Sequence, residues 1–310
     1  MKKGMDLLSI HALSADDVDE ILTFAADLKA KQKAGITHPI LAGKTLGMIF
    51  EKASTRTRVS FEVGMYQLGG QALFLSSRNL QLGRGEPIKD TARVLSRYLD
   101  GIMIRTYGHE RIEELARYAD IPVINALSDL LHPCQALTDL FTIREYKGKN
   151  LAGLKMAYVG DGNNMTHSLM YAAAKVGMHF AAATPEGYEA NAKVVANAKA
   201  DAAATGATVT ITHDPNEAVE GADVIVTDTW ASMGQEAEHD ARTAVFRPYQ
   251  VNRALVDAAD ARCIVMHCLP AYRGEEITED VFEEFAGVIF DEAENRLHVQ
   301  KAIMALVMGD

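Results

Sequence analysis

A regular alternation of short apolar segments with longer segments of helical spacing constrains the fold of this 310-residue chain more than any other feature. In the first half, apolar runs at Leu46–Phe50 and Gly101–Arg105 alternate with helical stretches such as 14–32. The second half restarts the pattern at 154–160 and continues it to 264–267. Strands that alternate with helices in this way pair in parallel. We therefore expect an α/β fold with two domains, each a parallel β-sheet flanked by helices.

A polar stretch at 147–150, Lys-Gly-Lys-Asn, separates the two series of segments. We expect one domain over residues 1–147 and a second over 148–310. A hydrophobic content of 48% is sufficient for two domain cores at this length. The last helix is expected over about 295–307, where the apolar residues follow helical spacing. We expect this final helix to pack back on the first domain.

Charge and cysteine content exclude several classes of function. The formal net charge of −11 argues against nucleic-acid binding and membrane-surface binding, which require a basic face. The three cysteines, at positions 134, 263 and 268, are too few for a disulfide framework and fit a reducing cytoplasm. The N-terminal segment lacks the apolar core of a signal peptide, and no apolar run reaches the ~18 residues of a membrane helix. A cytoplasmic protein is expected.

The run Ser54-Thr55-Arg56-Thr57-Arg58 lies between the apolar run ending at Phe50 and a helical stretch that stops at Gly69-Gly70. These hydroxyls and guanidiniums are therefore expected at a helix N-terminus, where N–H groups are unpaired and the helix dipole is positive. Two arginines there oppose the dipole unless an anion compensates them. A phosphate is favoured by N–H groups, hydroxyls and a guanidinium together. The alternative is a serine cap with two solvated arginines.

Further polar residues follow other predicted strands. In open α/β sheets, ligands bind beyond the carboxyl ends of the strands. Each residue taken alone has a simpler explanation as a cap, a turn residue or a solvated charge. Their common position predicts a site at this edge, formed by Ser54 to Thr57, Arg105, His132, Asn164, Asp228 and Cys268.

Two other kinds of site were weighed. Gly160 and Gly162 at a strand-to-helix turn are a partial dinucleotide fingerprint, but Met165 occupies the place of its third glycine. A nicotinamide-dependent oxidoreductase is therefore only an alternative. No cluster of histidine, cysteine and carboxylate residues has metal-ligand spacing, and no Ser-His-Asp arrangement is evident.

Five motifs together resemble the aspartate/ornithine carbamoyltransferase family. The five motifs are FEKASTRTRVSFEVGMYQLGG, HPCQ from His132, YVGDGNNMTHS, TDTWASMGQEAE, and HCLP from His267. The C-terminal segment EAENRLHVQKAIMALVM, which includes Arg296, follows them. HPCQ and HCLP are typical of the ornithine branch, since the aspartate branch has Thr and Pro at the two Cys positions. The resemblance implies a transfer of the carbamoyl group from carbamoyl phosphate to the side-chain amine of L-ornithine, giving L-citrulline and phosphate. It also implies arginine metabolism, with biosynthesis preferred and arginine breakdown left open as the alternative, and a homotrimer with sites at subunit interfaces.

The resemblance assigns roles to individual residues. The catalytic residues implied are Arg105, His132, Asp228 and Cys268. The first domain would bind carbamoyl phosphate and the second L-ornithine, the latter through Asn164, Asp228, Ser232 and Met233. The residues implied for carbamoyl phosphate are Ser54, Thr55, Arg56, Thr57, Gln81, Arg105, His132, Pro133, Cys134, Gln135, Cys268, Leu269 and Arg296.

The mechanism implied needs neither a metal nor another cofactor, because carbamoyl phosphate is already an activated acyl donor. Gln81 would enter the neighbouring subunit's site. Three alternatives stay open beside the ornithine reaction. A relative could act on putrescine or acetylornithine, an oxidoreductase would bind a nucleotide at Gly160, and a carbamoyl phosphate sensor would not need Asp228 or Cys268.

Overall fold

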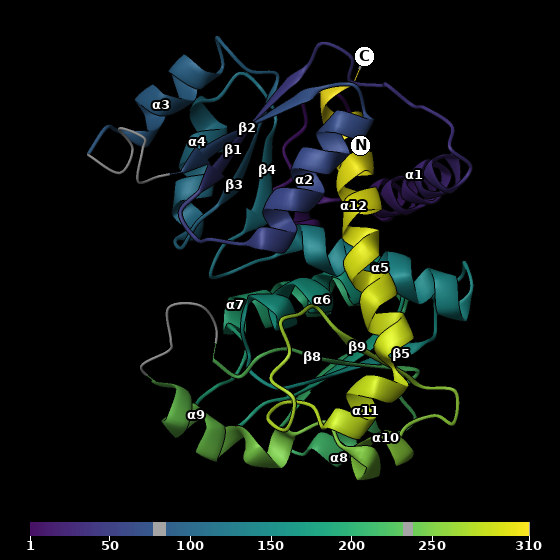
Figure 1. The fold of residues 1–310 in the computed structure, drawn as a ribbon. Helices are drawn as coiled ribbons and strands as arrows, with labels where there is room; N and C mark the ends of the chain where they lie inside the picture. Colours follow the sequence, from purple (N-terminus) through teal and green to yellow (C-terminus); the bar gives the residue numbers. More distant parts are fainter. Residues whose placement is uncertain (77–84, 232–237, 310) are drawn as a thin grey trace. The chain divides into compact units, whose positions relative to one another are not determined.

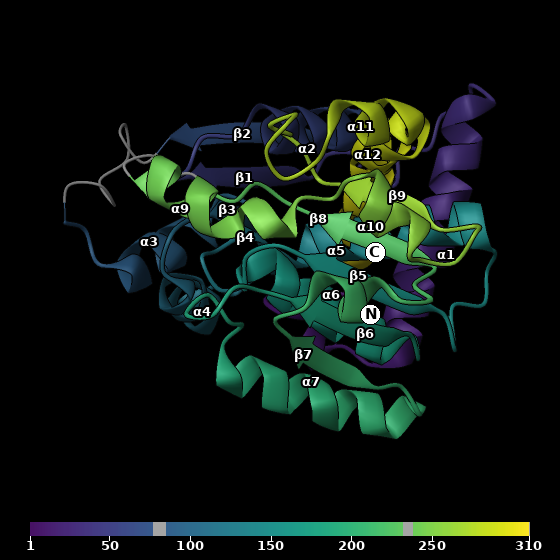
Figure 2. The same cartoon turned by 90° about the horizontal axis from the view of Figure 1, so that it is seen from below.

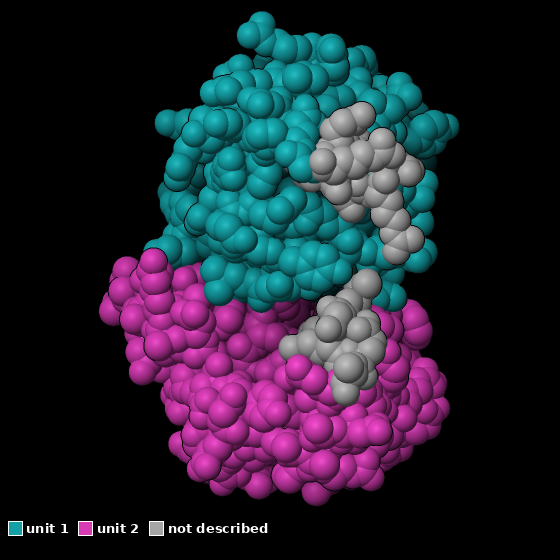
Figure 3. Space-filling view, turned by 90° about the vertical axis from the view of Figure 1, so that its left-hand side faces the viewer, with its two compact units in different colours: residues 1–138, 295–310 teal, residues 139–294 magenta. Residues whose placement is uncertain are grey.

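The computed structural model describes residues 1–76, 85–231 and 238–309. The chain forms two compact units, one of residues 1–138 and 295–310 and the other of residues 139–294, which Figure 3 shows in different colours. The division falls within the helices α5 (Pro133–Lys147) and α12 (Ala286–Met308), so each contributes to both units. The predicted domain boundary, between residues 147 and 148, coincides with the end of α5.

The first unit contains a parallel four-stranded sheet in the order β2-β1-β3-β4. Leu46 pairs with Gly101 and Phe50 pairs with Arg105, so β1 and β3 end level with each other. The strands are β1 (Thr45–Phe50), β2 (Gln71–Ser76), β3 (Gly101–Arg105) and β4 (Val123–Leu127). Besides a 3-10 turn at Ile10–Ala12, its helices are α1 (Ala15–Lys33), α2 (Thr55–Gln67), α3 (Ile88–Leu95), α4 (His109–Tyr118), and parts of α5 and α12.

The second unit contains a parallel five-stranded sheet in the order β7-β6-β5-β8-β9. Its strands are β5 (Lys155–Val159), β6 (His179–Ala183), β7 (Val209–Thr212), β8 (Val224–Thr227) and β9 (Ile264–His267). Its longer helices are α6 (Asn164–Lys175) and α7 (Ala192–Thr205), and Figure 2 shows α7 beside β7 at one edge. The shorter ones are α8 (Pro215–Val219), α9 (His239–Phe246), α10 (Arg253–Asp257) and α11 (Glu279–Glu284), with a 3-10 turn at Arg247–Tyr249.

The prediction of two parallel sheets flanked by helices is confirmed (Figure 1). The predicted start of the final helix near residue 295 was wrong, because α12 begins at Ala286. Its first turns carry the buried side chains Val288 and Ile289, whose spacing continues the apolar pattern of the later turns. None of the helices among the described residues combines the length and apolar character required to cross a membrane.

Candidate active site

The first turn of α2 has the features of an anion-binding helix end. Ser54 caps the helix in an extended conformation, and its Oγ accepts the Thr57 N–H at 3.2 Å. The same hydroxyl donates to Thr57 Oγ1 at 3.1 Å. No acidic side chain lies in this first turn, so the positive end of the helix dipole is not compensated there by a neighbouring carboxylate. Thr55 and Arg56 open the helix beside Ser54, so this predicted run lies where an anion is favoured.

A second arginine reaches the same helix end from α12. Arg296 is 4% exposed, and its Nη2 donates to Thr57 Oγ1 at 2.7 Å. In Figure 1 the helices α2 and α12 run side by side within the first unit. This contact brings a guanidinium from the C-terminal segment to the N-terminus of α2, and its part in phosphate binding stays a prediction.

Arg105 and His132 add further polar groups to the first unit. Arg105 is buried at the end of β3, and His132 is buried just before α5. Burial, together with the nearby charges of Arg296 and Arg105, holds the pKa of His132 well below its usual range. The imidazole is therefore neutral at pH 7 and has one N–H to donate. A neutral donor beside guanidiniums suits the polarisation of a carbonyl oxygen.

The remaining residues of the HPCQ segment are buried at the start of α5. Pro133 is its first residue, and Gln135 is 1% exposed. Cys134 donates its thiol to the Asn125 carbonyl of β4 at 3.4 Å, and burial raises the pKa of Cys134 to about 12. This thiol is a stable, protonated link between helix and strand. The predicted contact of Cys134 with carbamoyl phosphate stays a prediction.

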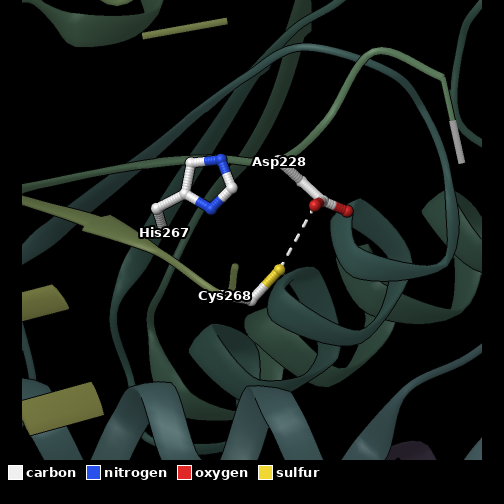
Figure 4. Close-up of side chains that lie close together, drawn as sticks. All are labelled: Asp228, His267 and Cys268. Carbon is white, nitrogen blue, oxygen red and sulfur yellow. Dashed lines mark hydrogen bonds between the residues drawn. The ribbon is translucent and has the colours of Figure 1, made fainter. Parts of the chain in front are cut away.

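In the second unit, Asp228 and Cys268 follow the neighbouring strands β8 and β9. Cys268 Sγ donates to Asp228 Oδ1 at 3.2 Å (Figure 4). Burial, followed by the charge of Asp228, raises the pKa of Cys268 well above its usual range. At neutral pH the sulfur is therefore a thiol that donates to the carboxylate, and it is a poor nucleophile in this state.

Asn163 is a residue of this site that the sequence reasoning missed. It caps α6, with its Oδ1 accepting the N–H groups of Met165 at 2.9 Å and Thr166 at 3.3 Å. Its Nδ2 lies 3.5 Å from Asp228 Oδ2. Asn164, which the resemblance implied for ornithine, is the first residue of α6, and its contact with the substrate stays a prediction. The signal for Asn163 was its place as the first of two asparagines at a strand-to-helix turn, where a cap is preferred.

Some predicted site residues cannot be placed. Gln81, Ser232 and Met233 lie outside the described residues. Leu269 directly follows Cys268 in a left-handed backbone conformation, with φ 58°. The residues expected for carbamoyl phosphate thus divide between the two units, with Cys268 and Leu269 in the second.

The glycines of the partial dinucleotide fingerprint have a structural explanation. A Cβ on Gly162 would lie 2.3 Å from the Ala190 amide nitrogen and 2.4 Å from the Tyr188 carbonyl oxygen. Gly162 N–H also donates to that carbonyl at 2.9 Å. The close approach of residues 188–190 therefore requires glycine here without any nucleotide.

Donor atoms of Asp228, His267 and Cys268 lie within 4.8 Å of one another, which is the spacing of a metal cluster. However, His267 Nε2 is bonded to Glu276 Oε1 at 2.9 Å, and its Nδ1 accepts the Leu269 N–H at 2.9 Å. Both imidazole nitrogens are thus engaged within the protein. We do not propose a metal site for this cluster.

Comparison with known proteins identifies the family. The aspartate/ornithine carbamoyltransferase carbamoyl-P binding domain matches residues 5–145, and the Asp/Orn binding domain matches residues 152–307. The chain belongs to this carbamoyltransferase family. The prediction of the family from the sequence motifs is confirmed.

Relatives within the carbamoyltransferase family match over the full length. An ornithine carbamoyltransferase of Carboxydothermus hydrogenoformans is 60% identical over 307 residues, covering 99% of this chain and 98% of the relative. The structure of ornithine carbamoyltransferase from Pyrococcus furiosus has a TM-score of 0.95 and 56% identity, covering 99% of this chain and 97% of that one. An anabolic ornithine carbamoyltransferase structure from Campylobacter jejuni has a TM-score of 0.92 and 43% identity, with 97% of each chain covered.

Proposed function

We propose that this chain transfers the carbamoyl group of carbamoyl phosphate to the side-chain amine of L-ornithine, giving L-citrulline and phosphate. Full-length relatives with this name, 56–60% identical, support the reaction. The observation that carries the proposal is the first turn of α2, where Ser54 and Thr57 meet the guanidinium of Arg296. Steady-state formation of citrulline from the two substrates tests it directly.

In this proposal the phosphate of carbamoyl phosphate occupies the N-terminus of α2. The N–H groups of the first turn, the side chains Ser54 to Thr57 and Arg296 would hold it and stabilise it as a leaving group. Arg105, neutral His132 and Gln135 would polarise the carbonyl and stabilise the oxyanion of the tetrahedral intermediate. Such preorganised donors are usually the largest contribution to acyl-transfer catalysis.

The nucleophile is the δ-amine of ornithine, whose pKa in solution should be close to lysine's value of about 10.4. It must lose a proton before it attacks the carbamoyl carbon. In this proposal the Asp228 carboxylate holds an ammonium group of the substrate, and the Cys268 thiol is hydrogen-bonded to that carboxylate. The amine forms the new C–N bond, the C–O bond to phosphate breaks, and the amine proton leaves through these groups or solvent.

Phosphate binding can be tested separately from turnover. Arg56→Ala should weaken the binding of carbamoyl phosphate by ~1.5–3 kcal/mol, the value of a charge-assisted hydrogen bond, while the fold is retained. If calorimetry showed unchanged binding of carbamoyl phosphate, the assignment of its phosphate to the N-terminus of α2 would be refuted. Activity across ornithine, putrescine and acetylornithine decides which amine is the substrate, and an exclusive preference for either alternative amine would replace ornithine.

We also propose that the enzyme is a homotrimer. Support comes from the exposed apolar side chains of α2 and the edge strand β2, which include Val59 (50% exposed), Tyr66 (81%) and Phe74 (39%). Apolar side chains gathered beside an edge strand indicate an interaction surface. Solution mass measurement tests the trimer. Mixing Arg105→Ala subunits with Gln81→Ala subunits tests shared sites, since hybrid trimers should regain activity.

The proposed setting is arginine biosynthesis in the cytoplasm. The Pyrococcus furiosus relative is named an anabolic ornithine carbamoyltransferase, which supports the biosynthetic direction. Cys134, Cys263 and Cys268 are all free thiols, which suits a reducing compartment. Arginine auxotrophy on deletion of the gene would be the expected result, and growth without arginine would contradict a sole biosynthetic role.

A further inference from the structure

The turn that leads from β1 into α2 is attached to Arg105 through the main chain. The Glu51 N–H, directly after β1, donates to the Arg105 carbonyl at 2.9 Å, and the Lys52 N–H donates to the same oxygen at 3.4 Å. Ser54, which caps α2, lies three positions after Glu51. The proposed phosphate end of α2 and the arginine proposed to polarise the carbonyl are therefore joined at one hydrogen-bonded point.

The strand pairing on the other side of Arg105 is irregular. β3 and β4 pair Ile104 with Asn125 but Arg105 with Leu127, so the register shifts between Ile104 and Arg105. The next main-chain bond runs from the Thr106 N–H to the Leu127 carbonyl at 3.0 Å. Such a bulge disrupts the ladder locally and changes the direction in which a side chain leaves the strand. Contacts at Thr106 therefore help to determine where the Arg105 side chain points.

The Glu51 carboxylate supplies these contacts from the β1 side. Its Oε2 accepts a hydrogen bond from the Thr106 hydroxyl, and Thr106 directly follows Arg105. Its Oε1 accepts from Arg111 Nη2 at 2.8 Å. The Glu51 side chain is 12% exposed and Thr106 is 0% exposed, so these bonds are largely shielded from water. Each carboxylate oxygen thus holds a different part of the segment that leads from β3 into α4.

Arg111 lies where a cation is unfavourable on its own. It is the third residue of α4, and the dipole at the start of a helix favours negative charge, such as that of Glu110 beside it. The ion pair with Glu51 compensates the guanidinium. Because the Arg111 side chain is 35% exposed, the pair should contribute little to stability. A role in holding α4 against the turn before α2 explains the pair better than stability does.

We propose that Glu51 is a positioning residue for carbamoyl transfer: with Thr106 and Arg111, it fixes the direction of Arg105 relative to the N-terminus of α2. Figure 1 shows β1 and β3 side by side in the first unit. In this role Glu51 acts through the backbone of Arg105 and Thr106 and not on the substrate. The inference rests on the proposed function, in which Arg105 polarises the carbamoyl carbonyl.

Two substitutions of Thr106 separate the hydrogen bond from packing. Thr106→Val keeps the shape of the side chain and removes the hydroxyl, whereas Thr106→Ser keeps the hydroxyl and removes a buried methyl group. The kcat should fall by ~10²-fold in the valine variant, which a misplacement of about 1 Å can cause, and stay within about 10-fold of the wild type in the serine variant. The KM for ornithine should change little in both, because the proposed ornithine residues lie in the second unit.

Substitutions of Glu51 make the same comparison from the other partner. Glu51→Gln retains both contacts, since its Oε1 accepts from Arg111 and its amide N–H donates to the Thr106 hydroxyl. It should keep most of the kcat, whereas Glu51→Leu should lose ~10²-fold.

Asp201→Leu is the matched control for the loss of a partly buried carboxylate. The Asp201 side chain is 15% exposed and is paired with Lys175 Nζ at 3.2 Å in the second unit. Like Glu51→Leu, this variant removes one half of an ion pair, but no residue of the proposed site adjoins it in the sequence. Its kcat should equal that of the wild type, whatever its effect on the free energy of unfolding.

The connection to Arg105 is tested by combining variants. Arg105→Ala should itself lower kcat, and the addition of Thr106→Val should lower it no further, because the hydroxyl acts through Arg105. Crystal structures of the variants give a readout that does not need turnover. The Arg105 guanidinium should be displaced in Thr106→Val and in Glu51→Leu, and it should keep its wild-type position in Thr106→Ser and in Glu51→Gln.

Three results would overturn the proposal: equal kcat in the valine and serine variants, additive losses in the double variant, or an unmoved Arg105 guanidinium in Thr106→Val. If Thr106→Val does not fold, Glu51→Leu and Glu51→Gln decide the question by the same criteria. A wild-type enzyme that forms no citrulline would instead refute the proposed function, and the crystal structures would still test whether Glu51 sets the direction of Arg105.

Discussion

Arg296 Nη2 and Thr57 Oγ1 are joined at 2.7 Å although the two residues lie 239 positions apart in the sequence. The contact attaches the last helix, α12, to the first turn of α2. Gly64 lets the two helices approach closely, because a Cβ there would lie 3.0 Å from Met304 Cε. At the other end of α2, Lys301 Nζ donates to Gln67 Oε1 at 2.8 Å. The helix that carries the proposed anion site, α2, is therefore supported along its length by α12.

Arg296→Met should weaken phosphate binding while the protein stays folded. The variant loses a guanidinium that is bonded to Thr57 within the proposed site, so the loss should be ~1.5–3 kcal/mol, or at least about 10-fold in the dissociation constant. Calorimetry with inorganic phosphate measures it. Arg97→Met, at an exposed arginine, is the matched control and should bind as the wild type does. Equal affinities in the two variants would exclude Arg296 from the site.

Lys301 is expected to make stability depend on alkaline pH. The side chain is 0% exposed, and its ammonium donates to Gln32, His38 and Gln67, none of them a carboxylate. Burial lowers the pKa of Lys301 from 10.5 to about 8. The unfolded chain thus binds more protons than the folded one between these values, and stability should rise as the pH increases through this window.

The measurement is the free energy of unfolding in urea at pH 8 and pH 10, in the wild type and in Lys301→Met. The wild type should gain about 1–3 kcal/mol relative to the variant as the pH rises. Lys31→Met, at a partly exposed lysine paired with Asp27, is the control and should keep the wild-type dependence. Parallel pH curves for wild type and Lys301→Met would show that this lysine does not titrate in the window.

Arg242→Met should destabilise the second unit more at pH 8 than at pH 5. Arg242 donates to the Asp161 carboxylate and to the Trp230 carbonyl, and its side chain is 5% exposed. Burial, partly opposed by Arg242, raises the pKa of Asp161 from 3.8 to about 6. A raised carboxyl pKa means that stability is lost as the pH increases from the unfolded value through the folded value.

Without Arg242 the pKa of Asp161 in the folded protein should rise further, so the free energy of unfolding should keep falling up to a higher pH. We expect about 3–5 kcal/mol of destabilisation at pH 8, as for a buried charge that loses its partner, and clearly less at pH 5. Urea unfolding at the two pH values measures this. The double variant Arg242→Met/Asp161→Asn should lack the pH dependence. If Arg242→Met were equally destabilising at both pH values, the ionisation of Asp161 would not be the cause of the destabilisation.

The sequence predicted best those parts of the fold that depend on local patterns. The bounds of β3 (Gly101–Arg105) match the apolar run that predicted it, because a buried parallel strand is apolar along its whole length. The start of α2 was predicted for a similar reason, since Ser54 is a preferred cap before a helical run. The residues that directly follow the strands were chosen as site candidates because ligands of α/β sheets bind beyond the carboxyl ends of the strands.

Features that depend on distant partners could not be predicted. The helices α8 and α10 have five residues each, too few to show a helical period. Lysine is rarely buried, so nothing in the sequence marked Lys301 as 0% exposed. The hydrogen bonds of Asn163 with Asp228 and of Glu276 with His267 join residues that only the fold brings together.

Cys268→Ser should damage ornithine turnover far more than phosphate binding. Cys268 lies beside Asp228, 3.2 Å from its Oδ1, and its raised pKa keeps it a thiol at neutral pH. We therefore expect it to orient the substrate amine and share in proton handling, a role typically worth ~10²–10⁴-fold in rate. The comparison is kcat and the KM for ornithine, beside the dissociation constant of inorganic phosphate, which should be unchanged.

Cys263→Ser is the matched control, because Cys263 is a buried thiol directly before β9 that lies in the apolar core of the second unit. Burial raises the pKa of Cys263 to about 12, and its Sγ contacts the Ile264 carbonyl at 3.5 Å. A hydroxyl buried there should lower stability by about 1–3 kcal/mol and leave kcat unchanged. Equal, small effects on kcat at both cysteines would refute the role of Cys268. A carbamoyl–cysteine adduct trapped in the wild type would replace direct attack by the amine with covalent catalysis.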